Sequence, residues 1–208
     1  MLRDVVVVGG SIAGLRAAET FRTDGYEGRL TVIGAEAHLP YDRPPLSKKL
    51  LAGDWEPERI ELRKSHEYGD LDIELRLGVP ASGLDVTAQT IHLADGATEP
   101  HGGIVIATGA APRKLAGQPA LAGIFELRTL DDCLGLRRVL EEGRQRVAVV
   151  GAGFIGAEVA ATARQGGHDV TLIEFLPVPL VRALGPELGE AIADLHRRQG
   201  VELSLIHI

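Results

Sequence analysis

The sequence predicts an α/β fold built from two three-layer (β/α) domains, because one local pattern occurs twice. Residues 5–14 and 147–156 each contain a short run of apolar, mostly β-branched residues, a glycine-rich turn and the start of an alanine-rich helix. A strand, a glycine turn and a helix that leads to a second strand form the β-α-β unit of dinucleotide-binding parallel sheets. Two copies a domain length apart indicate two dinucleotides in one chain, one to donate electrons and one to receive them.

The first domain is predicted to open with a β-α-β unit. Residues 4–8 are β-branched without alternation, which is typical of a strand buried on both faces. Residues 12–24 place apolar side chains on one helical face and precede Gly25, a residue type that commonly ends helices. The next strand covers residues 30–33, so we expect parallel strands joined by a right-handed crossover.

The middle of the first domain is predicted to mix a proline-rich loop with short strands. Residues 39–48 contain too much proline for regular structure at their start, and a short helix is expected near Leu46. Residues 94–96, Ala-Asp-Gly, predict a turn between strands. Short strands are predicted at residues 73–77, 84–86, 90–93 and 104–109, the last of them buried and ending in a tight glycine turn.

A shift to proline and glycine places a domain boundary near residue 112. The second domain is expected to contain a helix over residues 131–142 and a β-α-β unit over residues 146–173. A last helix over residues 186–199 begins with proline, which suits an early helical position, and a strand follows from Val201. The predicted division is a first domain over residues 1–111, a second over residues 112–202 and a tail over residues 203–208.

Composition argues against several classes of function. The formal net charge of −7 argues against a nucleic-acid surface, which needs a basic face, and against a polybasic membrane anchor. No apolar stretch approaches the ~20 residues needed to span a bilayer, and no room for a signal peptide is expected before the first strand. Cys133 is the single cysteine, so we expect no internal disulfide, no thiol pair for disulfide reduction and a reducing cytoplasm.

The second glycine turn fits the dinucleotide pattern in full. Gly151 allows the tight turn out of the strand, Gly153 lets the backbone approach a pyrophosphate, and Gly156 lets the helix pack closely on the strand. The helix N-terminus offers free N–H groups to the anion. Glu174 follows near the spacing of the acid that binds a ribose 2′-hydroxyl. Its charge would repel a 2′-phosphate, which favours NADH over NADPH.

The first glycine turn departs from this pattern. Ser11 stands in the second glycine position, so a pyrophosphate must lie slightly differently or accept a hydrogen bond from the hydroxyl. Ala35 stands where a carboxylate would be convenient, and Glu36 follows either as the ribose ligand or as a solvated loop residue. On spacing alone, the first turn is the weaker dinucleotide signal.

The loop after the first β-α-β unit is specific to one family. Residues 39–51, Leu-Pro-Tyr-Asp-Arg-Pro-Pro-Leu-Ser-Lys-Lys-Leu-Leu, closely resemble a loop of NADH-dependent ferredoxin reductases. These putidaredoxin-reductase-like flavoproteins serve bacterial oxygenase and cytochrome P450 systems, within the FAD-dependent pyridine nucleotide-disulfide oxidoreductase superfamily. Further matches lie at residues 106–109, 127–129 and 151–161. The resemblance extends from residue 1 to about residue 201 and implies FAD on the first domain and NADH on the second.

Carried over by motif, the resemblance implies two sets of cofactor contacts. The FAD contacts are Gly9, Ser11, Ala13, Gly14, Glu36, Arg43, Lys48, Ala81, Thr108, Gly109 and Arg128. The NADH contacts are Gly151, Gly153, Phe154, Ile155, Gly156, Glu158 and Glu174. Lys48 and Glu158 match catalytic residues near the reactive edge of the flavin. A cation there would stabilise negative charge on the reduced ring, and the glutamate would hold that cation.

The activity implied by the resemblance is electron transfer. Hydride would pass from NADH to FAD, and the flavin would release single electrons to a ferredoxin-type [2Fe-2S] protein. Acidic ferredoxins call for a basic docking patch, but the one arginine cluster, at residues 137, 138, 144 and 146, more simply caps and solvates a helix end. No metal site is expected. The seven histidines show no ligand spacing, and six of them are expected at the surface: His38, His66, His92, His101, His168 and His196.

Other functions stay open. Rubredoxin reductases, the flavoprotein part of nitrite reductases and apoptosis-inducing factors share these motifs. A non-catalytic nucleotide-binding or redox-sensor module is a second class, and Ser11, Ala35 and the short chain favour it.

The final six residues, Leu-Ser-Leu-Ile-His-Ile, depart from the charged residue and glycine turn with which the family continues. They match the translation of a transposase adapter, which predicts a non-native tail, whereas a natural apolar strand is the alternative. In the family a later segment completes the FAD domain and a C-terminal domain follows. We therefore expect an incomplete FAD domain, no C-terminal domain, and a chain that as written binds FAD poorly and has little reductase activity.

Overall fold

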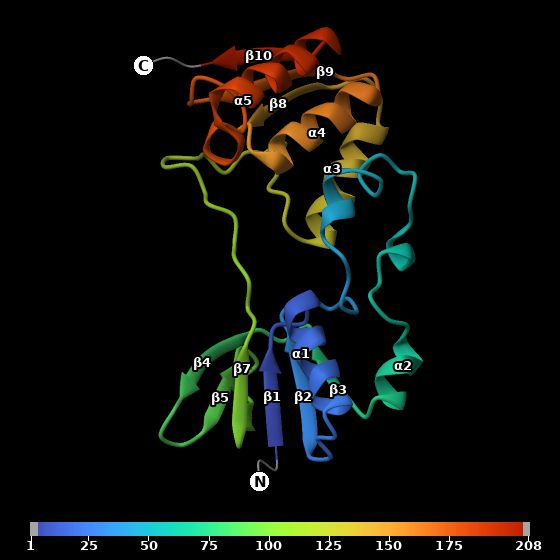
Figure 1. The fold of residues 1–208 in the computed structure, drawn as a ribbon, viewed down its shortest axis with the longest axis vertical. Coiled ribbons are helices and arrows are strands. Elements are labelled where there is room, and N and C mark those ends of the chain that lie inside the picture. The colour runs from blue at the N-terminus through green and yellow to red at the C-terminus, as the bar shows by residue number, and fades with distance from the viewer. Residues whose placement is uncertain (1–3, 206–208) are drawn as a thin grey trace. The chain divides into compact units, whose positions relative to one another are not determined.

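The computed structural model describes residues 4–205, which form two compact units (Figure 1). Unit 1 contains the described residues up to Asp42 together with Glu58–Arg113, and unit 2 contains Arg43–Pro57 together with the described residues from Lys114 onward. Parallel sheets with crossover helices confirm the predicted α/β class. The predicted first domain includes Arg43–Pro57, which packs with unit 2, and the assignment of one cofactor to each domain stays a prediction.

Unit 1 is built on a four-stranded parallel sheet of order β3-β2-β1-β7 (Figure 1). Its strands are β1 (Asp4–Val8), β2 (Arg29–Gly34), β3 (Glu74–Leu77) and β7 (Gly103–Ile106). Its helices are α1 (Ile12–Thr23) and α2 (Ser65–Asp70), and the short 3₁₀ helix η2 (Pro57–Arg59) lies between them in the sequence. Helix α1 connects β1 to β2 and ends just before Gly25, whose φ of +80° suits glycine.

Strand β1 separates two layers of core. Val5 and Val7 pack on one side with Leu15 and Ala18 of α1. On the other side, Val6 and Val8 pack with a three-stranded antiparallel sheet through its residues Ile91 and Leu93. That sheet has the order β4-β5-β6 and consists of β4 (Ala81–Asp85), β5 (Thr90–Leu93) and β6 (Thr98–Pro100). The alternation of buried side chains across β1 produces the three-layer arrangement.

Two strands of unit 1 differ from the prediction. β7 ends at Ile106 instead of running to residue 109, and the Ile106 side chain is 66% exposed although a buried strand was predicted. The reason is that β7 lies at an edge of the sheet, where fewer neighbours cover it. β4 begins at Ala81 instead of residue 84, because β5 extends the antiparallel pairing back to an Ala81–Leu93 pair across a β-bulge.

Unit 2 contains a three-stranded parallel sheet of order β10-β9-β8. Its strands are β8 (Arg146–Val150), β9 (Asp169–Glu174) and β10 (Glu202–Leu205). Its helices are α3 (Leu130–Glu141), α4 (Phe154–Gln165) and α5 (Val181–Arg198), with the 3₁₀ helix η1 (Pro44–Ser47) in the segment from the first half of the chain. Val170 and Leu172 of β9 pack with Ala160 and Ala163 of α4 to form the core.

Two expectations for unit 2 are wrong. The last helix begins at Val181 instead of Pro186, with a break at Gly185, whose φ is +80°. Pro186 still begins a helical segment, because proline has no N–H and the first residue after the break at Gly185 does not need one.

His168 and His196 are buried rather than at the surface. Buried polar rings need partners, and the two ring nitrogens of His196 lie 3.0 Å from the Ile192 carbonyl oxygen and 3.1 Å from the Ala157 carbonyl oxygen, either of which can accept from a ring N–H.

Residues 203–205 of the predicted tail continue β10, with Leu203 paired to Leu172 and Leu205 to Glu174 of β9. Residues 206–208 of that tail lie outside the described residues. Within residues 4–205, no helix has both the length and the apolar character needed to cross a membrane.

Candidate functional site

The two glycine turns share one feature of local packing. An ideal Cβ built on Gly14 would lie 1.9 Å from the Gly9 carbonyl oxygen, and one built on Gly156 would lie 1.9 Å from the Gly151 carbonyl oxygen. No side chain fits at that distance. The third glycine of each motif is therefore required by the close approach of helix and strand, as its spacing predicts.

The second turn is open above its first two glycines. Gly151 has a φ of +99°, and ideal Cβ atoms on Gly151 and Gly153 meet no atom within 4 Å. The backbone conformation accounts for glycine at position 151, but no protein contact accounts for it at position 153. Gly153 is also the N-cap of α4, and no side chain caps that helix. The turn therefore leaves space and main-chain N–H groups for an anion.

Glu174 lies beside this turn at the end of β9. Its Oε2 accepts a hydrogen bond from the Ala152 N–H at 2.6 Å, and its Oε1 accepts one from the Leu176 N–H at 2.8 Å. The two bonds hold the carboxylate next to the glycine turn, at the position expected for the acid of a nucleotide ribose.

The first turn is more confined. Gly9 has a φ of +126°, and an ideal Cβ there would lie 2.1 Å from the Ala107 carbonyl oxygen and 3.1 Å from the Thr108 nitrogen. Residues Ala107 and Thr108, which follow β7, therefore lie in close contact with the turn. Ser11 is the N-cap of α1 and makes no side-chain capping bond to that helix, and Glu36 accepts a hydrogen bond from the Tyr41 hydroxyl.

The remaining predicted FAD contacts of unit 1 lie in α1, in the loop after β7 and in β4. Ala13 lies in the first turn of α1, and Gly109 follows Thr108 with a φ of +72°. Ala81 is exposed at the start of β4, in the antiparallel sheet, where it pairs with Leu93.

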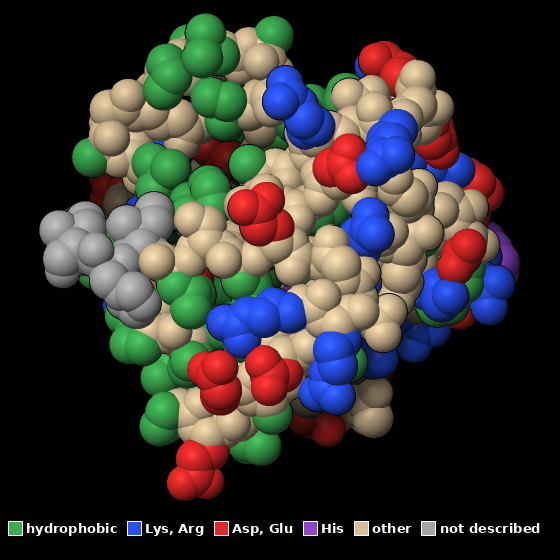
Figure 2. All heavy atoms as spheres, turned by 90° about the horizontal axis from the view of Figure 1, so that it is seen from above, with side chains coloured by type: hydrophobic (Ala, Val, Ile, Leu, Met, Phe, Trp, Pro, Cys, Tyr) green, Lys and Arg blue, Asp and Glu red, His purple; other side chains and the backbone are tan. Residues whose placement is uncertain are grey.

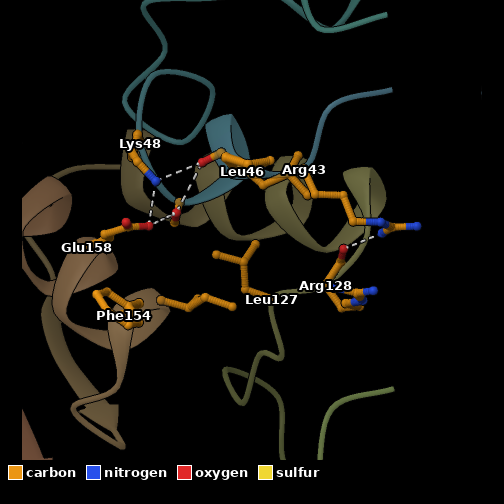
Figure 3. A pocket seen from close by; sticks show the side chains of 10 residues that line it. Arg43, Leu46, Lys48, Leu127, Arg128, Phe154 and Glu158 are labelled. Atoms are coloured by element: carbon orange, nitrogen blue, oxygen red, sulfur yellow. Dashed lines mark hydrogen bonds and ion pairs between the residues drawn. The ribbon is translucent and has the colours of Figure 1, made fainter. Parts of the chain in front are cut away.

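A pocket of about 300 Å³ lies within unit 2. Three segments distant in sequence line it: η1 and the residues beside it, the residues just before α3, and the start of α4 (Figure 3). The lining residues are Arg43, Pro44, Leu46, Ser47, Lys48, Leu127, Arg128, Phe154, Ile155 and Glu158. Six of the predicted cofactor contacts therefore meet at one place: Arg43, Lys48, Arg128, Phe154, Ile155 and Glu158.

An ion pair stands at one side of this pocket. The Lys48 ammonium lies 2.6 Å from Glu158 Oε2, and the two side chains point toward one another in Figure 3. The same Oε2 accepts a hydrogen bond from the Ser47 hydroxyl at 2.6 Å. Burial alone would raise the pKa of Glu158, but the hydrogen bonds from Lys48 and Ser47 outweigh it and hold that pKa below its usual range.

Further hydrogen bonds join the segment that carries Lys48 to α3, to α4 and to the residues before α3. The Cys133 thiol donates to the Leu46 carbonyl oxygen at 3.1 Å, and the Thr162 hydroxyl donates to the Ser47 carbonyl oxygen at 2.8 Å. On the far side of the pocket, Arg43 donates to the Arg128 carbonyl oxygen at 2.6 Å. Burial raises the pKa of the Cys133 thiol to about 11, so this cysteine is a packing residue and not a nucleophile.

Sequence reasoning missed Ser47 and Thr162. Ser47 lies between Leu46 and Lys48 in the loop that carries the family resemblance, and Thr162 is one helical turn after Glu158. The four-residue spacing of Glu158 and Thr162 places both on one face of α4. That spacing was the available signal, but only the fold shows that Ser47 bonds to both.

Two of the four arginines in the cluster, Arg137 and Arg144, form ion pairs. Arg137 bonds to Glu141 at 2.7 Å and to Glu56 at 3.2 Å, and Arg144 makes a two-pronged contact with Asp169 at 2.6 and 3.0 Å. Figure 2 shows Lys and Arg side chains interspersed with Asp and Glu over one side of the face in view, while hydrophobic side chains gather on the other side. Among the described residues of that face, no patch of one charge stands out.

Comparison with known proteins agrees with these features. The chain is 41% identical over 206 residues to the ferredoxin reductase component of a chlorobenzene dioxygenase from Cupriavidus sp. (strain PS12), covering 99% of this chain and 50% of that protein. It is 41% identical over 207 residues to the ferredoxin–NAD(+) reductase subunit of a benzene 1,2-dioxygenase system from Pseudomonas putida, with the same coverage. The chain thus spans about half the length of the curated relatives it matches.

A solved structure and a family model extend the comparison. A crystal structure of a covalent putidaredoxin reductase–putidaredoxin complex matches with a TM-score of 0.90 at 34% identity, over 98% of this chain and 49% of the other. The predicted resemblance to this group of reductases is confirmed. The family model described as pyridine nucleotide-disulphide oxidoreductase matches residues 3–207. The chain therefore belongs to the pyridine nucleotide-disulphide oxidoreductase family.

Proposed function

We propose that the protein of which this chain is a part is a cytoplasmic, FAD-dependent oxidoreductase. It takes hydride from NADH and passes single electrons to a ferredoxin-type [2Fe-2S] protein. The observation that carries the proposal is the pocket of unit 2. There the Lys48–Glu158 ion pair lies among residues for which the family resemblance implies contact with FAD and residues for which it implies contact with NADH.

The second glycine turn suits the pyrophosphate of NADH. Gly153 has open space above it and an uncapped helix behind it, and a Cβ at that position would project into that space. The Glu174 carboxylate beside the turn can accept hydrogen bonds from ribose hydroxyls and would repel a 2′-phosphate. Both features support NADH as the hydride donor.

The pocket suits an anionic cofactor such as FAD. Arg43 and Arg128 supply guanidinium groups and Lys48 supplies an ammonium, against the single carboxylate of Glu158 among the residues that line it. Guanidinium groups bind phosphate oxygens well because their N–H donors match them in pairs. Gly9, Ser11 and Gly14 of unit 1 stay FAD contacts that the family resemblance implies.

Bound FAD would supply the chemistry that turns one hydride into two separate electrons. The protein would act through charge. Lys48 would place a cation where negative charge develops, and Glu158, held ionised by Lys48 and Ser47, would keep that cation in place. Disulfide chemistry is not supported within these residues, because Cys133 is the only thiol and is buried.

The electron acceptor and the compartment are argued from relatives and composition. Relatives of this chain are named as ferredoxin reductase components, and one solved relative is bound to putidaredoxin. A single cysteine, buried and unpaired, suits a reducing cytoplasm.

The test is the reduction of bound flavin by NADH in a full-length version of the protein. NADH should bleach the flavin absorbance in an anaerobic stopped-flow experiment, and added ferredoxin should then restore it. Lys48→Met should slow the bleaching by about 100-fold, a typical effect of losing one electrostatic stabiliser. Lys49→Met is the matched control and should change little, because Lys49 pairs with Asp54 on the outside of the segment. A wild-type protein without bleaching would contradict the proposal and favour the redox-sensor module.

A further inference from the structure

We propose that Ser47 is a positioning residue, whose hydroxyl holds the Glu158 carboxylate in place for its ion pair with Lys48. The inference rests on the proposed function for the purpose of that ion pair. It concerns a residue that is outside both sets of predicted cofactor contacts and that reaches the site through Glu158.

The hydroxyl has one strong acceptor. Ser47 is only 3% exposed, so its O–H must find a partner inside the protein. The distance from Oγ to Glu158 Oε2 is 2.6 Å, whereas the distance to the Pro44 carbonyl oxygen is 3.4 Å. The short contact to a charged acceptor is the stronger bond, and the hydroxyl proton is therefore directed at Glu158.

Lys48 alone would hold Glu158 poorly. Its ammonium sits on a long flexible side chain that is about half exposed, and it also contacts the Pro44 carbonyl oxygen at 3.1 Å. Ion pairs of this exposure contribute little by themselves. The Ser47 hydroxyl is a donor on a short side chain in a buried segment, and it binds the same oxygen, Oε2, that Lys48 binds.

Ser47 is itself held through its main chain. The Thr162 hydroxyl donates to the Ser47 carbonyl oxygen at 2.8 Å, and the neighbouring Leu46 carbonyl oxygen accepts from Cys133 at 3.1 Å. Neither bond involves Glu158. The main-chain bonds therefore place Ser47, and its side chain places Glu158, so the two roles can be separated by mutation.

The charges around Glu158 are few. Lys48 at the end of η1 binds it, and Arg43 beside η1 and Arg128 before α3 line the same pocket, whereas α4 contributes the apolar Phe154 and Ile155. Burial would raise the pKa of Glu158, and the bonds from Lys48 and Ser47 lower it. Because a lowered carboxyl pKa reflects stabilisation of the charged form, removing the Ser47 donor should move the titration of Glu158 to higher pH.

The experiment follows the Glu158 carboxyl carbon by ¹³C NMR during a pH titration of the 208-residue chain without cofactors. Glu158→Gln assigns the signal. Ser47→Ala should raise the apparent pKa of Glu158 by about one unit, which is the scale expected for one lost charge-assisted hydrogen bond. Ser47→Thr keeps the hydroxyl and should restore the wild-type titration. Thr162→Val removes one of the two main-chain bonds, the bond from Cys133 to the Leu46 carbonyl oxygen still holds the segment, and the titration should stay unchanged.

Trp55 provides the structural check, because it is the single tryptophan and lies in the same Arg43–Pro57 segment. Its emission should be the same in wild type and in Ser47→Ala. An unchanged Glu158 titration in Ser47→Ala, an equal rise in Thr162→Val, or a shifted Trp55 emission in Ser47→Ala would overturn the proposal, since the hydroxyl would then serve only to seat the segment. The titration uses neither NADH nor flavin, so failure of the proposed reductase activity would not alter it.

Discussion

The two β-α-β units have nearly the same sequence pattern but different surroundings. In both units, an ideal Cβ built on the third glycine would lie 1.9 Å from the carbonyl oxygen of the first glycine. Yet Val8, which precedes the first turn, is 7% exposed, and Val150, at the same place before the second, is 59% exposed. β1 lies between β2 and β7, whereas β8 is an edge strand. The motif thus determines the local path of the chain, and neighbouring strands decide how much room the turn has.

The acids beside the two turns also differ. Glu174 bonds to the Ala152 N–H inside its own glycine turn, while Glu36 accepts from the Tyr41 hydroxyl. The second turn therefore combines open space with an acid beside it. The first combines close confinement by Ala107 with a serine in place of the second glycine. These differences support a regular NADH site in unit 2 and an altered FAD site in unit 1.

The largest expected effect separates the two first glycines. Gly9→Ala should destabilise unit 1 by about 4 kcal/mol, because a clash with the Ala107 carbonyl adds to the strain of a positive φ. Gly151→Ala suffers the strain alone and should destabilise unit 2 by roughly 1–2 kcal/mol. Hydrogen-exchange mass spectrometry of β1 and β8 would measure each unit separately. Equal losses in the two variants would show that the two turns are equally confined.

The third glycines should respond alike. Gly14→Ala and Gly156→Ala each force a Cβ against a carbonyl oxygen, and each should destabilise its own unit by roughly 2–3 kcal/mol. Cys133 offers a probe of unit 2, since burial raises its pKa to about 11 and keeps it unreactive in the folded state. Thiol labelling at pH 8 should accelerate in Gly156→Ala and stay slow in Gly14→Ala. Faster labelling in both would mean that the units do not unfold independently.

Gly153 should matter for binding but not for folding. Gly153→Ala places a Cβ in open space, at an ordinary negative φ, so stability should change by less than about 0.5 kcal/mol. The same methyl group would crowd a pyrophosphate, and NADH affinity should fall about tenfold, or roughly 1.4 kcal/mol. Titration by NADH fluorescence measures this. Ser11→Gly, the change at the matching position of the first turn, is the control and should leave NADH affinity unaltered.

The smallest expected effect concerns the two acids. Glu174→Gln removes the charge beside the second turn, so NADH affinity should fall about fivefold, or roughly 1 kcal/mol, while the preference over NADPH narrows. Glu36→Gln should change neither the affinity for NADH nor the affinity for NADPH. If Glu36→Gln weakened NADH as much as Glu174→Gln, the assignment of NADH to the second turn would be wrong.

The local elements of the fold could be predicted because short-range patterns determine them. The apolar runs before Gly9 and Gly151 form β1 and β8, and the glycine spacing predicts where α1 and α4 begin. Lys48 and Glu158 were predicted as site residues from the family resemblance of the short motifs that contain them. The sequence did not predict that both residues lie within unit 2. Residues Arg43–Pro57 follow the first β-α-β unit in the chain, but they pack against α3 and α4.

What the sequence could not predict depends on contacts between distant residues. His196 looks like a polar surface residue, but the Ala157 carbonyl of α4 gives it a buried partner. Ile106 looks like core, but β7 lies at a sheet edge. The hydrogen bond from Ser47 to Glu158 joins residues 111 positions apart. No periodic pattern encodes such contacts, which arise when the sheet and helices are assembled.

The central claim is that NADH binds the second glycine turn and not the first. Backbone amide NMR of the 208-residue chain during an NADH titration, without flavin, tests it most directly. The amide signals of residues 151–156 should shift, led by Ala152, whose N–H bonds to Glu174, and the signals of residues 9–14 should stay in place. Shifts confined to residues 9–14, or equal at both turns, would contradict the claim.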